Sequence, residues 1–297
     1  MLVSRRRLGR IAVMLSVITM LALPLSTSVT MASPSTVDIQ MAVCVDGSGS
    51  ISASDWTLMK EGLASAVEDG SIVPQDGSVE LTIIQFAQGS ATTEAGPTVI
   101  ASQADTDTMA STIRGMSQRG SLTPMAAAFD EATYQITNSP NYSDSARQII
   151  NVSTDGQPTY PTSDAEQAAI DARDAAIAAG IDEIHCEAVG SADSEWLRTK
   201  IAWPQPGWLV DPNFPPRNPD GSLQNGFVVE VDSYSEYADA IAEKFVIITN
   251  GGTPIPSAST WSAIIAVTLL GSAALVILRR KSNDDVKTYW ARRLNDY

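Results

Sequence analysis

Apolar and polar positions follow two different periods along the middle of the chain. Short apolar runs predict strands that are buried on both faces. They lie at 39–45, 79–86, 147–152, 181–189 and 226–231, with a short edge strand at 97–101. Apolar residues at helical spacing predict helices between them. These lie at 54–69, 109–116, 124–137, 163–179, 193–201 and 234–247.

Alternating strands and helices imply βαβ crossovers. We therefore expect one α/β domain over residues 37–249: a doubly wound, mostly parallel six-stranded sheet with helices on both faces. The segment 203–225 interrupts the pattern with six prolines and several aromatic residues. It predicts a long ordered loop that starts at the sheet edge opposite the carboxyl ends of the strands.

The N-terminal pattern predicts a secretory signal peptide over residues 1–32. A basic start at Ser4-Arg5-Arg6 is followed by an apolar run and by small residues around Ala32. The start loosely resembles a twin-arginine signal, and both twin-arginine and ordinary secretory export stay open.

The C-terminal pattern predicts a membrane anchor. Residues 261–278 carry no charge, are long enough as a helix to cross a bilayer, and are followed by Arg279-Arg280-Lys281. The positive-inside rule then makes 279–297 a cytoplasmic basic tail and 250–260 a stalk, so that the domain faces outward in the cell envelope. The stretch IPSASTW, an apolar helix and RRK also resemble a C-terminal sorting signal. Because the chain continues to Tyr297, a cleaved signal and a retained single-span anchor both stay open.

The charge distribution narrows the classes of function. The chain has 19 Lys and Arg against 34 Asp and Glu, a net charge of -15. The two ends hold ten of the basic and three of the acidic residues, so residues 33–258 keep 9 basic and 31 acidic ones. Such a section attracts cations and excludes nucleic-acid binding, which needs Lys and Arg to neutralise phosphates. One His and two Cys exclude a zinc-ribbon framework. His185, inside a predicted strand, is interpreted as a packed residue.

Three predicted loops bring oxygen-bearing side chains to one edge of the sheet. The first strand ends in Asp46-Gly47-Ser48-Gly49-Ser50, Thr123 precedes a helix, and Asp155 follows the strand at 147–152. Carboxylates and hydroxyls are hard ligands of the kind that Mg²⁺ prefers, and ligands of doubly wound sheets bind at this edge. The first loop alone is a weak signal, because Gly, Ser and Asp also form ordinary turns.

Taken together, the three loops resemble the metal-ion-dependent adhesion site of the von Willebrand factor A (VWA) family. The pattern matches at five positions, which are Asp46, Ser48, Ser50, Thr123 and Asp155. The resemblance covers about residues 37–249, and the runs RQIINVSTDGQPT and GFVVEVDSYSEYADAIAEKF look like a bacterial exported subgroup of the family.

The resemblance implies a bound Mg²⁺, or Mn²⁺ or Ca²⁺, with one coordination position left for a carboxylate of a protein partner. It also implies a strand order that separates Cys44 from Cys186 by another strand, so two buried free thiols are expected rather than a disulfide.

Three functions are compatible with such a site. The leading hypothesis is a membrane-anchored binding module for adhesion or complex assembly, not an enzyme. The second is a structural or assembly subunit in which the ion only holds the three loops together. The third is a metal-dependent hydrolase. It lacks an evident general base, because Asp46 and Asp155 are already assigned as ligands.

Overall fold

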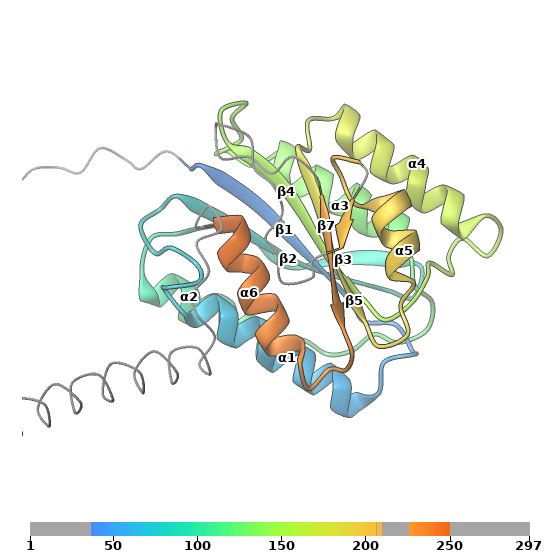
Figure 1. Cartoon of the computed structure of the whole chain (residues 1–297). Coiled ribbons are helices and arrows are strands. Elements are labelled where there is room, and N and C mark those ends of the chain that lie inside the picture. Colours follow the sequence, from blue (N-terminus) through green and yellow to red (C-terminus); the bar gives the residue numbers. More distant parts are fainter. Residues whose placement is uncertain (1–36, 206, 210–225, 250–297) are drawn as a thin grey trace, which may run out of the picture. The chain divides into compact units, whose positions relative to one another are not determined.

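The structure is a computed structural model that describes residues 37–205, 207–209 and 226–249 (Figure 1). The predicted signal peptide, stalk, transmembrane segment and tail lie outside these residues, as does most of the loop 203–225. Within the described ranges, no helix combines the length and hydropathy that a bilayer crossing requires.

A single sheet forms the centre of the domain. Its strands are β1 (Ile39–Asp46), β2 (Val79–Ala87), β3 (Ser90–Ile100), β4 (Arg147–Thr154), β5 (Glu183–Val189), β6 (Trp208–Leu209) and β7 (Phe227–Val231). Their spatial order is β3-β2-β1-β4-β5-β7-β6, and every neighbouring pair is parallel except β2 and β3. The six longer strands are those expected from the sequence, and β6 adds two residues at one edge.

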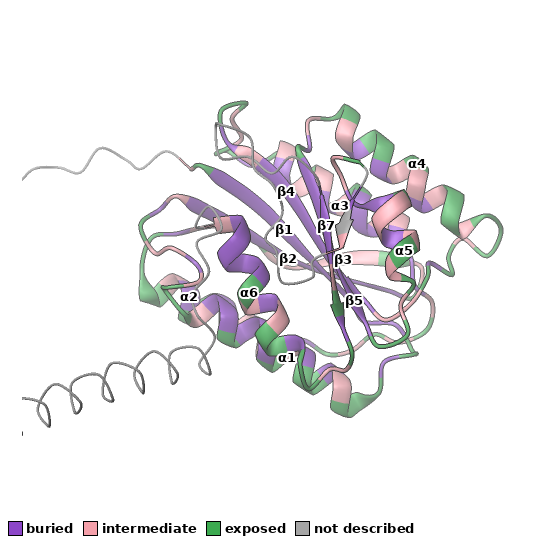
Figure 2. Cartoon of the chain, in the orientation of Figure 1, coloured by how far each residue is buried: buried purple, intermediate pink, exposed green. Residues whose placement is uncertain are grey.

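Helices cover both faces of the sheet, as expected (Figure 1). One face packs against α1 (Ala53–Glu68), α2 (Gln103–Gly115) and α6 (Tyr237–Thr249). The other packs against α3 (Met125–Thr137), α4 (Ala165–Ala178) and the π-helical turn η1 (Leu197–Ile201), which continues the short helix α5 (Ser194–Trp196). Strands β1, β2, β4 and β5 are buried over most of their length (Figure 2).

The edge strand β3 is much longer than the predicted 97–101. It pairs antiparallel with β2 through a tight turn at Gln88 and Gly89, whose φ angles are 57° and 91°. The strand is only partly buried and rich in Thr, Ser and Glu, so it lacks the apolar run that marks a central strand.

The segment 203–225 begins at the expected edge. The backbone of Trp203 exchanges hydrogen bonds with that of Ile184, near the amino end of β5, at 2.9 and 3.0 Å. Gly226 returns to the same place, because its N–H donates to the carbonyl of Pro204 at 2.8 Å. The segment therefore leaves and re-enters the domain at neighbouring positions.

Cys44 and Cys186 are both buried free thiols. They lie on β1 and β5, and β4 runs between these strands. The expected separation is thus confirmed. Burial raises the pKa of both thiols, which makes thiolate chemistry unfavourable at either position.

A row of polar side chains on β4 and β5 faces α6. We call it the polar stripe. It consists of the partly exposed Arg147 and of the buried Asn151, Ser153, Glu183, His185 and Glu187. Helix α6 contributes two side chains that contact the stripe. Lys244 pairs with Glu187, and the hydroxyl of Tyr237 hydrogen-bonds to that of Ser153. Glu183 and Glu187 are 2% and 0% exposed, so these two carboxylates do not contribute to the acidic surface of the domain.

At one end of the polar stripe, His185 is held in its neutral form. Its Nδ1 accepts from the N–H of Phe227 at 3.3 Å, so that its Nε2–H donates to Glu183 at 2.9 Å. Burial lowers the pKa of His185 to about 4. Burial alone would raise the pKa of Glu183, but hydrogen bonds from His185 and Arg147 outweigh it and lower that pKa to about 2. The interpretation of His185 as a packed residue is confirmed.

These two shifts predict that the domain loses stability in acid. His185 is neutral when folded but takes up a proton near its ordinary pKa of 6.5 when unfolded, so its contribution is present above pH 6.5 and is lost as the pH falls towards 4. The contribution of Glu183 is lost below pH 4.5. We expect the free energy of unfolding to fall by about 3 kcal/mol through His185 alone. Urea titrations across this range test it.

The control for this prediction is His185→Gln, which removes the titrating ring. This variant should lose the slope between pH 6.5 and 4.5 and keep the slope at lower pH. A difference in unfolding free energy between the parent chain and His185→Gln that stays constant from pH 6.5 to 4.5 would contradict the neutral, buried His185.

Candidate metal centre

The predicted site residues lie at the carboxyl ends of the neighbouring strands β1 and β4. Asp46 is the last residue of β1, and Asp155 directly follows β4. The hydroxyl of Ser50 donates to Asp155 Oδ1 at 2.9 Å, across a separation of 105 residues in the sequence. The two loops therefore converge as the sequence predicts.

Hydrogen bonds fix the first loop around Asp46. The N–H of Ser48 donates to Asp46 Oδ1 at 2.8 Å, and the hydroxyl of Thr154 donates to Asp46 Oδ2 at 2.7 Å. The hydroxyls of Ser48 and Ser50 lie 3.0 Å apart. A continuous path of oxygen atoms thus runs from Ser48 through Ser50 to Asp155. Asp46 and Ser48 are buried, whereas Ser50 is exposed at the rim.

The loop that carries Thr123 joins the site through its backbone. Gly49 N–H donates to the carbonyl of Ser121 at 2.9 Å, and Gly120 N–H donates to that of Gly47 at 2.7 Å. Gly120 and Ser121 have φ angles of 75° and 67°, a left-handed turn that lets the two loops approach closely. Thr123 is 5% exposed, and its hydroxyl makes no hydrogen bond to the other four predicted residues in the described structure.

The site concentrates negative charge without a cationic side chain to balance it. Burial raises the pKa of Asp46 to about 6, although hydrogen bonds from Thr154 and Ser48 oppose the rise. Burial also raises the pKa of Asp155. No Lys, Arg or His forms an ion pair with either carboxylate within the described residues. A bound cation would stabilise both charged forms.

The donor set suits a hard ion that prefers oxygen ligands. The described part of the chain holds no group of three or more His, Cys, Asp or Glu side chains that could bind a metal. Two carboxylates and three hydroxyls remain, which fits Mg²⁺, Mn²⁺ or Ca²⁺ with waters completing the coordination.

Sequence reasoning missed the side chains that support these loops. Gln118 donates from Nε2 to the carbonyls of Ser48 and Ile51 at 2.9 and 2.8 Å. Gln85 lies directly under Gly47, where an added Cβ would meet its Oε1 at 2.2 Å. Glutamines have no distinctive spacing in the sequence, so only the close approach of Gly47 could have indicated such a neighbour.

The hydroxyl of Tyr234 was missed as well. It is buried and has no hydrogen-bond partner among the described residues. Burial raises its pKa, and the negative charges of Asp155 and Asp46 add to the rise. Tyr234 therefore adds an unsatisfied polar group to the surroundings of the two carboxylates.

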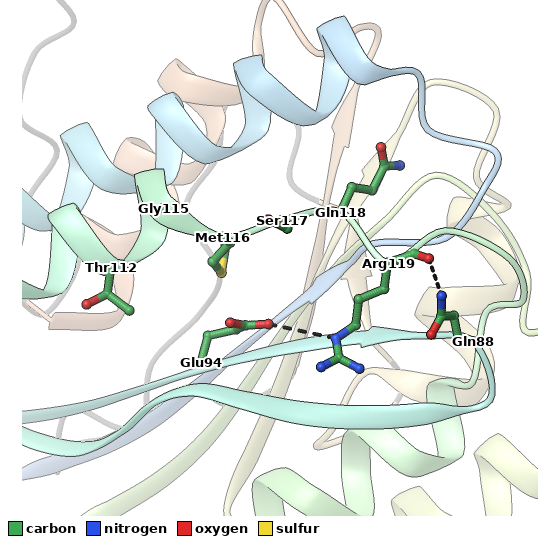
Figure 3. Close-up of a pocket in the computed structure, with 8 residues that line it drawn as sticks. All are labelled: Gln88, Glu94, Thr112, Gly115, Met116, Ser117, Gln118 and Arg119. Carbon is green, nitrogen blue, oxygen red and sulfur yellow. Dashed lines mark hydrogen bonds and ion pairs between the residues drawn. The ribbon is translucent and has the colours of Figure 1, made fainter.

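A polar pocket of about 540 Å³ is lined in part by Gln118 (Figure 3). It lies beside the candidate metal centre, because Gln118 donates to the carbonyl of Ser48. Figure 3 shows the side chain of Arg119 directed towards Glu94, from which its Nε lies 4.0 Å away. Gln85 lies under Gly47 of the first loop and also contacts the pocket. Its Nε2 donates to Glu94 at 3.1 Å, and its Oε1 accepts from the N–H of Arg119 at 2.9 Å. The pocket is lined by Gln88, Glu94, Thr112, Gly115, Met116, Ser117, Gln118 and Arg119.

Comparison with solved structures supports the fold. Proximal thread matrix protein 1 from the mussel byssus aligns with a TM-score of 0.50 and 16% identity, over 70% of this chain and 48% of that protein. The pilus adhesin SpaC from Lactobacillus rhamnosus GG aligns with a TM-score of 0.52 and 11% identity, over 72% of this chain and 31% of SpaC. The chain thus spans about half the length of the mussel protein and a third of SpaC. The comparison with curated proteins gives no match.

The strand order, the helices on both faces and these structural likenesses define a VWA-like domain. A family model described as "Protein of unknown function (DUF1194)" matches residues 36–251, and the chain belongs to this family.

Proposed function

We propose that the domain binds a divalent cation and, through it, an acidic side chain of a protein partner. Asp46, Ser48, Ser50, Thr123 and Asp155 would hold the ion. The observation that carries this proposal is the hydrogen bond between Ser50 and Asp155, because it joins two oxygen-bearing loops beside an unbalanced pair of carboxylates. The ion would neutralise Asp46 and Asp155, and the partner's carboxylate would replace one of its waters.

The setting of this function follows from the sequence pattern. The signal peptide over 1–32 and the anchor over 261–278 would place the domain outside the membrane, in the cell envelope. Oxygen ligands and an outward-facing domain suit adhesion or complex assembly. The structural alternative, in which the ion only staples the loops, has support in the backbone hydrogen bonds that already join them.

Hydrolysis has less support. Both carboxylates of the site are used in holding the loops or the proposed ion. His185 lies on the polar stripe beneath α6, so it is not available as a general base at the carboxyl ends of the strands.

The direct test is partner capture with the full-length chain immobilised from a detergent extract, in Mg²⁺ and then in EDTA. We expect captured envelope proteins to be released by EDTA and to rebind when Mg²⁺ is restored. Ser50→Ala should weaken capture, and Ser54→Ala, a nearby serine outside the oxygen path, should not. Capture that is unchanged in EDTA while the melting temperature falls would favour the structural alternative.

The pocket beside the metal centre predicts a second contact with the partner. Arg119 supplies a positive charge in a strongly acidic domain, and its pairing with Glu94 at 4.0 Å is loose. We expect Arg119→Gln to weaken partner binding about tenfold, equivalent to ~1.4 kcal/mol, without changing Mg²⁺ affinity. Arg198→Gln, which alters an ion pair with Glu195 on α5, is the matched control. Equal partner affinities of the two variants would exclude the pocket from the interface.

A further inference from the structure

Three buried side chains outside the metal centre meet at the middle of the polar stripe. They are Lys244 on α6, Glu187 on β5 and Asn151 on β4, and each is 0% exposed. Lys244 Nζ lies 2.9 Å from Glu187 Oε1. Asn151 Nδ2 donates to the same Oε1 at 3.2 Å and to Oε2 at 3.0 Å. One carboxylate thus holds an amine and a primary amide side by side.

These side chains are fully buried, and protein groups satisfy their polar atoms only in part. The Phe227 ring centroid lies 5.3 Å from Lys244 Nζ. Apart from its contact with Glu187, Nζ has no hydrogen-bond partner within the described residues, and Asn151 Oδ1 has none either. An ordinary buried ion pair is favourable only when its remaining donors and acceptors are satisfied. This group does not meet that condition.

Burial also favours the form of the amine that can react. Burial lowers the pKa of Lys244 and so favours the neutral amine over the ammonium. A neutral, desolvated lysine is a nucleophile, and a carboxylic acid beside it can transfer protons. A neutral Lys244 amine would then lie beside the Glu187 carboxyl group, to which the amide of Asn151 also donates.

We propose that Lys244 and Asn151 join in an intramolecular isopeptide bond, with Glu187 transferring the protons. The lone pair of Lys244 Nζ attacks Asn151 Cγ and forms the new C–N bond. Glu187 takes one proton from Nζ and gives one to Nδ2, so its own protonation is unchanged. The Cγ–Nδ2 bond then breaks and ammonia leaves. One amide replaces another, and neither an oxidant nor a cofactor is needed.

The bond would fasten the last helix of the domain to its central sheet. Lys244 belongs to α6, while Asn151 lies on β4 between β1 and β5. It would also replace a buried ionisable amine by an amide that carries no charge at any pH. The inference concerns the polar stripe alone and stands apart from the proposed metal-dependent binding.

Peptide mapping of the full-length chain tests the bond. Trypsin and chymotrypsin together should release residues 148–173 joined to residues 238–245. This branched peptide should weigh one ammonia less than its two parts, and trypsin should not cleave after Lys244. Lys60, which lies outside the polar stripe, should remain free to tryptic cleavage and serves as the internal control.

Glu187→Gln and Lys244→Met test the assigned roles. Both variants should give only linear peptides, and the Glu187→Gln variant keeps the lysine and the asparagine in place. Linear peptides with intact Lys244 and Asn151 from the folded parent chain would overturn the proposal. Loss of ammonia without a branched peptide would also overturn it, because it would indicate a cyclised asparagine. A branched peptide in Glu187→Gln would overturn the role of Glu187.

Discussion

Asp46→Ala is expected to abolish binding of Mg²⁺. The carboxylate is fully buried, and both of its oxygens accept hydrogen bonds, from the N–H of Ser48 and the hydroxyl of Thr154. Without it, one carboxylate remains for the ion, and we expect the affinity to fall by more than about 100-fold. Isothermal titration of the full-length chain with Mg²⁺ measures this loss. Undiminished binding would refute the metal centre.

The control for this experiment is Asp171→Ala, an exposed carboxylate on α4. Its removal should leave Mg²⁺ affinity unchanged. Thermal melting in EDTA separates loss of the ion from loss of the fold. Burial raises the pKa of Asp46, so its negative charge opposes folding at neutral pH when no cation is bound. Removing this charge should therefore not lower the melting temperature of Asp46→Ala below that of the parent chain in EDTA.

Gly226→Ala is expected to be the most destabilising of the small substitutions considered. An added Cβ would lie 2.3 Å from Trp203 N, 2.5 Å from Trp203 O and 2.6 Å from Ile184 O. These are backbone atoms in paired segments, so no side chain can move aside to relieve the contact. We expect a loss of about 3 kcal/mol in the free energy of unfolding, at the upper end of overpacking effects. Urea denaturation measures it.

Gly96→Ala on β3 is the matched control, because an added Cβ there meets nothing within 4 Å. It should leave stability unchanged or raise it slightly, since alanine reduces the freedom of the unfolded chain. If the two variants were equally stable, Trp203 and Gly226 would not be packed as the structure has them.

The fold could be predicted from the sequence for strands that are buried on both faces, because such strands appear as apolar runs. The runs 39–45, 79–86 and 147–152 carry apolar residues on both faces of the strand because helices cover both sides of the sheet. The edge strand β3 has no such run. Its true extent depends on pairing with β2 through the turn at Gln88 and Gly89, which is decided by contacts outside its own sequence.

The polar stripe could not be predicted for a related reason. Glu183 and Glu187 read as surface residues, because burial of a carboxylate depends on partners that are distant in the chain. Arg147 binds Glu183 from 36 positions away, and Lys244 approaches Glu187 from α6. Neither pairing has a local signature in the sequence.

The metal centre could be predicted from the sequence only in part. The topology of parallel strands brings Asp46 and Asp155 to one edge, so their proximity follows from placing β1 beside β4. Thr123 reaches the same edge only through a left-handed turn at Gly120 and Ser121. A turn of this kind is suggested by its glycine but not fixed by it, and the support by Gln118 could not be foreseen at all.

The two ends of the described domain emerge on the side away from the metal centre (Figure 1). Residue Asp38 pairs with the first residue of β4, Arg147, whose guanidinium also donates to the carbonyl of Ile248 near the end of α6 at 2.9 Å. An attachment at either terminus would therefore act on this end of the sheet, whereas the candidate metal centre lies at the opposite end. A domain attached through its termini would direct the face with the proposed metal centre away from the point of attachment. Tension along the chain would orient that face and would not bury it.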